Sequence, residues 1–134
     1  MRIADSQFDP ESLAELCTEA LRLLATGNID GLAERFGYAF AYAFDGDPVR
    51  AIQADLASSL ASVGATSLAQ ADAQIPKVGY YKPDSAGLLA LIEGRAPTNN
   101  GKTILVELVV TGSGDEKYIT LEQISAPLCR PLCS

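Results

Sequence analysis

The chain has 134 residues, 48% of them hydrophobic and 20% charged, so it is long enough to fold as one domain around its own core. Its 17 acidic and 10 basic residues give a formal charge of −7, which disfavours binding to nucleic acid or to anionic membranes. It contains no histidine, which removes the most common general base and metal ligand, and no apolar run approaches the roughly 18 residues of a membrane span.

The negative charge is concentrated in the first half of the chain. Residues 1–75 carry eleven acidic residues and four arginines, whereas residues 76–134 carry six acidic and six basic residues. Such an imbalance favours either solubility or a basic partner. The N-terminal stretch "MRIADSQFDPES" lacks the apolar segment of a secretory signal, so we expect a cytoplasmic protein.

The first predicted helix begins at Asp9 and Pro10, because aspartate is a good N-cap and proline suits the first helical position. Apolar residues then recur at helical spacing, at Leu13, Leu16, Cys17, Ala20, Leu21 and Leu24. Gly27 is expected to end this helix. Cys17 lies within the apolar stripe, so its thiol is expected to be buried.

The second predicted helix begins at Asn28 and includes the run "RFGYAFAYAF", residues 35–44. In a helical projection the aromatic residues separate by chemistry onto two sides, with Phe36, Phe40 and Phe44 on one and Tyr38 and Tyr42 on the other. A strand would place all five rings on one face, and the intervening alanines also favour a helix. We therefore predict a helix through residue 44.

The third predicted helix repeats the pattern of the first, with Asp47 as the cap and Pro48 at the first helical position. Its apolar stripe consists of Val49, Ile52, Leu56, Leu60 and Val63. Gly64 is expected to end it.

The second half of the chain changes to a strand pattern. Four short segments rich in Val, Ile, Leu, Thr and Tyr are separated by turn-forming clusters: "KVGYYK", "AGLLALIEG", "KTILVELVV" and "KYITLEQIS". Asn100-Gly101 between the second and third segments is a strong hairpin signal. We predict an α+β fold in which three N-terminal helices pack on a four-stranded antiparallel meander sheet. The single domain, residues 1–134, is expected to comprise an N-terminal arm (1–9), a helical half (10–64), a sheet half (74–125) and a C-terminal tail (126–134).

Two sequence features look like cofactor or metal sites but do not predict one. The stretch "APTNNGKT" is similar to a phosphate-binding loop, yet a strand rather than a helix follows it. Cys129 and Cys133 are too few to form a zinc site without histidine, and we expect free thiols on the tail. We therefore expect no cofactor and no metal.

The exposed side of the second helix is the first candidate binding surface. Tyrosines that lie among charged residues are typical anchors of protein interfaces. The residues assigned to this surface are Tyr38, Tyr42, Glu34, Asp45, Asp47 and Asp55. In the alternative interpretation, the sheet edge or the C-terminal tail covers the two tyrosines and makes them part of the core.

A second candidate site is a pocket between sheet and helices, lined by Tyr80, Tyr81, Glu93 and Glu107. Tyr80 and Tyr81 should point to opposite faces of their strand, so one of them is expected in the core. Glu93 and Glu107 lie on strands predicted to be neighbours, where a close pair of carboxylates would raise one pKa and form an acid–base couple. The alternative is that Glu93 pairs with Arg95 or Lys102 at solvent-exposed positions.

The order of helices followed by a strand meander, with the phrase "ATGNIDGLAERF" at a helix–turn–helix junction, resembles the NTF2-like and cystatin-like α+β proteins. This resemblance implies a sheet that curves around helices and a fold that hosts enzymes, ligand binders and interaction modules. NTF2-like enzymes place a histidine or a carboxylate pair in the cone between helices and sheet, and this chain has no histidine. In composition the chain also resembles small acidic immunity proteins, which neutralise basic toxins.

Two functions follow from these features as expectations. The first is a non-catalytic interaction module whose acidic helical half binds a basic protein, such as a toxin, with Tyr38 and Tyr42 as anchors. The second is a small-molecule binder or weak carboxylate enzyme that uses Glu93 or Glu107. Homodimerisation through the tyrosine surface is a further option that the sequence leaves open.

Overall fold

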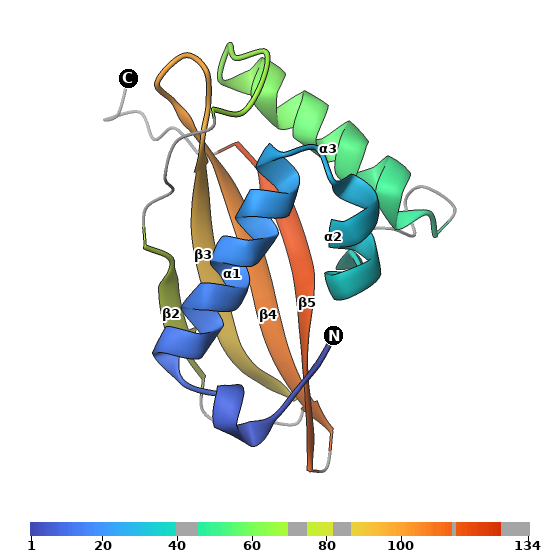
Figure 1. Ribbon diagram of the computed structural model, residues 1–134, viewed down its shortest axis with the longest axis vertical. Helices are drawn as coiled ribbons and strands as arrows, with labels where there is room; N and C mark the ends of the chain where they lie inside the picture. Colours follow the sequence, from blue (N-terminus) through green and yellow to red (C-terminus); the bar gives the residue numbers. More distant parts are fainter. Residues whose placement is uncertain (40–45, 70–74, 82–86, 114, 127–134) are drawn as a thin grey trace.

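The computed structural model of the chain describes residues 1–39, 46–69, 75–81, 87–113 and 115–126 (Figure 1). These residues form an α+β fold in which the helices precede most of the sheet, as predicted. The elements in chain order are β1 (Arg2–Ile3), the 3-10 helix η1 (Asp5–Gln7), α1 (Pro10–Ala25), α2 (Ile29–Phe36), α3 (Pro48–Ser62), β2 (Lys77–Tyr80), β3 (Leu88–Pro97), β4 (Thr103–Ser113) and β5 (Glu116–Ser125).

The sheet is antiparallel, with the strand order β1-β5-β4-β3-β2. Strands β2 to β5 pair in chain order and form the predicted four-stranded meander. The prediction of four strands is nevertheless wrong by one, because Arg2 and Ile3, assigned to an N-terminal arm, pair with Tyr118 and Lys117 of β5. A strand of two residues is too short to leave a periodic signal in the sequence.

Figure 1 shows the helices gathered on one face of the sheet, with α1 in front of β3 and α3 near β5. The strands alternate accordingly, and every second residue in the middle of β3 and β4 is buried against the helices. Strand β5 follows the same alternation up to Leu121, and an irregularity in its pairing with β4 then shifts the next buried residue to Ile124. The helix-facing residues of these strands are Ala90, Ile92, Ala96, Ile104, Val106, Leu108, Val110, Ile119, Leu121 and Ile124. They form one core with the apolar stripes of the helices.

Helix α1 follows the sequence prediction closely. Asp9 caps it by accepting a hydrogen bond from the Ser12 amide at 3.0 Å, and Pro10 is its first residue. Cys17 is fully buried, as predicted, and burial raises the pKa of its thiol to about 12. Its sulfur packs over Gly94 of β3, where the absence of a side chain brings helix and sheet close together.

The predicted extent of the second helix is wrong. Helix α2 ends at Phe36 because Gly37 adopts a positive φ of 69°, which other residues rarely reach, and the chain then leaves the helical path. Tyr38 turns inward as a result. Phe40, Tyr42 and Phe44 lie outside the described residues, so the rest of the predicted helix is not described.

The third helix and the β3–β4 connection agree with prediction. Asp47 caps α3 by accepting hydrogen bonds from the amides of Val49 and Arg50, at 3.1 and 3.3 Å. Residues 98–102, the centre of the phosphate-loop-like stretch, form a hairpin loop between two strands, closed by the Thr98 amide on the Lys102 carbonyl at 2.9 Å. No helix follows this loop, so it lacks the helix N-terminus that cradles phosphate.

Candidate functional site

Tyr38 belongs to the core and not to a binding surface. Its side chain is 6% exposed, and its hydroxyl donates a hydrogen bond to Asp55 of α3 and accepts one from the Ile124 amide of β5 at 3.2 Å. Burial, followed by the bond to Asp55, raises the pKa of Tyr38. Since residues 1–3 bond to β5 only from Lys117 to Ile119, the Tyr38 hydroxyl occupies part of the β5 edge that they leave open.

The predicted tyrosine surface therefore does not form as expected. Asp55 holds the buried Tyr38 hydroxyl, and Asp47 is occupied as the cap of α3. Glu34 is exposed on α2, whereas Tyr42 and Asp45 lie outside the described residues. The alternative interpretation, in which the tyrosine is part of the core, is correct for Tyr38.

The predicted pocket between sheet and helices is also wrong, because its residues lie on different faces. Glu93 and Glu107 alternate with buried core residues and so point to the face of the sheet opposite the helices. Tyr80 lies on the helix side, where its ring meets Phe8 edge-on at 5.3 Å. Tyr80 and Tyr81 are 46% and 45% exposed, so neither is in the core.

The prediction that Glu93 and Glu107 lie on neighbouring strands is confirmed. Glu93 and Glu107 are directly opposite in the β3–β4 register, an arrangement in which like charges repel. Burial, with the charges of Glu93 and Glu122 adding to it, raises the pKa of Glu107. No ion pair with Arg95 or Lys102 involves Glu93 among the described residues.

This pair leads to a pH-dependent stability. A carboxyl whose pKa is raised by folding stabilises the fold while it is protonated, and that contribution is lost as the pH rises through the folded pKa. Glu107→Gln is therefore expected to raise the free energy of unfolding near neutral pH by less than about 1 kcal/mol, and with it the melting temperature. This gain should vanish below about pH 4. Thermal unfolding of Glu107→Gln near neutral pH and below about pH 4 measures the gain, with Glu34→Gln on α2 as the control. An equal gain at the two pH values would contradict the prediction.

A groove with a volume of about 750 Å³ lies between α1 and β2. One wall is the outward side of α1 and the other is the chain that enters and forms β2. The residues on the two walls that matter below are Glu11, Glu15, Glu19 and Arg22 of α1, and Ile75, Pro76 and Val78. Ile75 is 88% exposed, so this wall presents a large apolar side chain to solvent.

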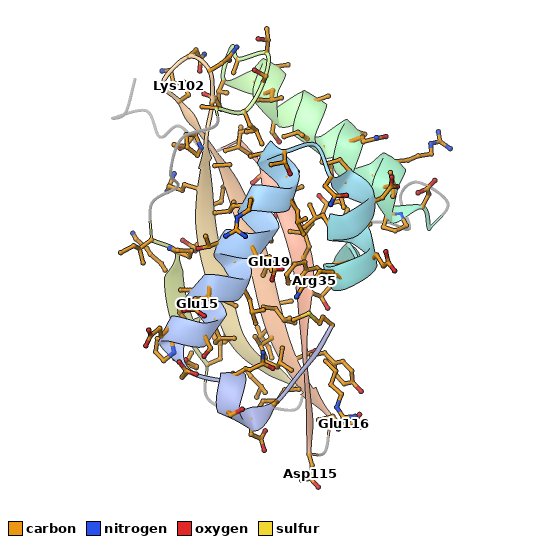
Figure 2. All side chains as sticks on the ribbon, in the orientation of Figure 1. Glu15, Glu19, Arg35, Lys102, Asp115 and Glu116 are labelled. Atoms are coloured by element: carbon orange, nitrogen blue, oxygen red, sulfur yellow. The ribbon has the colours of Figure 1, made fainter. Side chains whose placement is uncertain are left out.

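The α1 wall carries an acidic row. Glu11, Glu15 and Glu19 are spaced four residues apart and so follow one line along the helix. Figure 2 shows Glu19 turned toward Arg35 of α2, with which it forms an ion pair. That pair leaves Glu11 and Glu15, both exposed, as the acidic part of the groove, and Arg22 as the basic end.

Sequence reasoning did not identify this groove, although part of the signal was present. The glutamates at positions 11, 15 and 19 fall on the side of α1 opposite its apolar stripe, so their exposure followed from the helix prediction. The opposite wall was not predictable, because the sequence around Ile75 and Pro76 does not show whether the isoleucine is buried in the core or exposed. Only the strand order, with β2 at an edge, shows that Ile75 lies outside the core.

Comparison of the chain with known protein families, curated proteins and solved structures gives no match. In the part of the chain that is described, no helix is both long enough and apolar enough to cross a membrane. Within the same residues, no three carboxylate or thiol side chains come together in a way that would hold a metal ion. The site must therefore be interpreted from its own residues.

Proposed function

We propose that the protein is a non-catalytic interaction module that binds a basic protein partner in the groove between α1 and β2. The observation that carries this proposal is the combination, in one groove, of an exposed apolar wall at Ile75 and an acidic wall at Glu11 and Glu15. Lysine and arginine fit both walls, because their aliphatic stems cover apolar surface while their charged ends reach the carboxylates. Because the chain resembles immunity proteins in composition, a basic toxin is one candidate for this partner.

The charge of the whole chain supports the same conclusion. A formal charge of −7 attracts basic partners at a distance and raises the rate of encounter, while the groove supplies the short-range contacts. The acidic residues that were predicted to contact the partner are replaced here by Glu11 and Glu15, because Asp47 and Asp55 are engaged within the fold.

The test is a pair of matched charge reversals. Peptides selected from a random library on the full chain are expected to be rich in lysine and arginine. The double variant Glu11→Lys/Glu15→Lys should weaken their binding at least about tenfold, because both carboxylates face the bound cations. Isothermal titration calorimetry at two salt concentrations measures the affinity, which should fall as the salt rises.

The control variant is Asp30→Lys/Glu34→Lys on α2. It reverses two exposed acidic residues at the same four-residue spacing and changes the net charge equally. If both variants weakened peptide binding equally, the effect would come from the overall charge, and the peptides would not be recognised by the groove. Selected peptides without an excess of basic residues would overturn the proposal.

A further inference from the structure

Strand β2 has an outer edge that no other described segment pairs with. It lies at the end of the strand order and bonds to β3 on one side only. The Tyr81 amide donates to the Leu89 carbonyl at 2.9 Å, and pairing continues in register to Lys77 opposite Glu93. In an antiparallel pair, bonding to the neighbour alternates along the strand. Lys77 and Gly79 therefore bond to β3, and the amides and carbonyls of Val78 and Tyr80 point outward.

The acidic groove lies along this same edge. Val78, whose backbone points outward, also lines the groove with its side chain, together with Ile75 and Pro76 that precede it. Proline at position 76 has no N–H to offer, so two amides, those of Val78 and Tyr80, are the donors of this edge. An open strand edge beside a helix is a place where an extended peptide can add to a sheet.

We propose that the basic partner enters the groove as an extended segment and adds a strand to the outer edge of β2. This inference rests on the proposed function and specifies how the partner is recognised. The backbone of the segment bonds to Val78 and Tyr80. Its alternate side chains, on the helix side of the sheet, lie between Val78 and α1, where cationic ends meet Glu11 and Glu15.

The dimensions of the two walls agree with such a segment. The four residues of β2 extend over roughly 13 Å at the rise of an antiparallel strand. From Glu11 to Glu19, α1 rises by roughly 12 Å. A segment of four or five residues, roughly, therefore spans both walls, and two side chains on its helix side reach the acidic row.

Synthetic peptides test the strand addition on the unaltered protein. The probe is an alternating Lys-Val peptide of about ten residues with blocked ends, compared with one copy N-methylated at every lysine and one at every valine. Alternate amides of a strand point to opposite edges, so one methylated copy should lose binding at least about tenfold and the other should keep it. An alternating Glu-Val peptide is the control for charge.

Amide hydrogen exchange of the saturated complex supplies the second readout. The amides of Val78 and Tyr80 should exchange rapidly in the free protein and at least about tenfold more slowly in the complex, because they become hydrogen-bonded. Those of Lys77 and Gly79, bonded to β3, should be protected in both states and serve as internal controls.

The outcomes separate the two proposals. If both methylated copies bind as tightly as the parent peptide, or if the Val78 and Tyr80 amides are not slowed, strand addition is overturned while basic recognition stands. If the Glu-Val peptide binds as well as the Lys-Val peptide, the proposed function itself fails. Loss of binding in one methylated copy, with slowed exchange at both amides, would establish strand addition.

Discussion

Replacing Gly94 by valine is expected to lower the free energy of unfolding by about 3 kcal/mol. A Cβ atom on Gly94 would lie 2.7 Å from the Cys17 sulfur, closer than Cβ atoms approach other atoms in folded proteins, and a tight 3.1 Å from a methyl group of Leu21. Both neighbours are buried in α1, so the helix itself must move away from β3 to make room. The gain from the better strand propensity of valine, at most about 1 kcal/mol, does not offset this.

The matched control is Gly79→Val in β2. A Cβ atom there would meet a single atom, the Leu91 carbonyl oxygen at 4.0 Å, so the residue fits without displacement. Urea denaturation should show a clear loss of stability for Gly94→Val and a change within about 0.5 kcal/mol for Gly79→Val. Equal stability of the two variants would mean that α1 does not pack on β3 as closely as the structure has it.

Gly94 also shows what the sequence discloses about the fold and what it withholds. The strand "AGLLALIEG" was predicted from its β-branched and apolar residues, and a glycine within it indicates either a bend or a close approach. That the approach is to Cys17 depends on how the helix crosses the sheet, which no local pattern contains. The starts of α1 and α3 were predictable because their signals are local. Asp9-Pro10 and Asp47-Pro48 cap the helical residues that follow them directly.

The aromatic run shows the limit of periodicity. The separation of phenylalanines from tyrosines in a helical projection predicted an exposed tyrosine side, but the helix stops at Gly37. The local reason was visible, because glycine is a poor helix former and a common helix end. The burial of Tyr38 was not, since its partners Asp55 and Ile124 lie 17 and 86 residues further along the chain.

The groove illustrates a third case, in which the sequence identifies the residues of the two walls but does not show that the walls lie next to each other. The exposed acidic row of α1 was implied by the helix prediction, and the strand "KVGYYK" was predicted. Their proximity depends on the strand order, which places β2 at the sheet edge that α1 flanks. A meander of known strands still leaves open which of its edge strands the first helix approaches, and only the three-dimensional arrangement settles that question.

Replacing Tyr38 by phenylalanine is expected to lower the free energy of unfolding by about 2–3 kcal/mol, the second large effect that the structure predicts. The substitution keeps the ring and removes only the hydroxyl. The Ile124 amide then loses its acceptor at a buried position, and the Asp55 carboxylate loses its donor. The control is Tyr81→Phe, which removes the same group from a side chain that is 45% exposed, and its effect should stay within about 0.5 kcal/mol.

The pH dependence of this difference identifies the hydroxyl as its source. Because folding raises the pKa of Tyr38, its stabilising effect is fully present below the pKa of an unfolded tyrosine, about 10, and is lost as the pH rises through the higher folded pKa. The stability difference between the unaltered protein and Tyr38→Phe should therefore be constant up to about pH 9 and shrink above about pH 10. Urea denaturation at several pH values measures it, and a difference that stays constant into the alkaline range would show that the hydroxyl is not buried between α3 and β5.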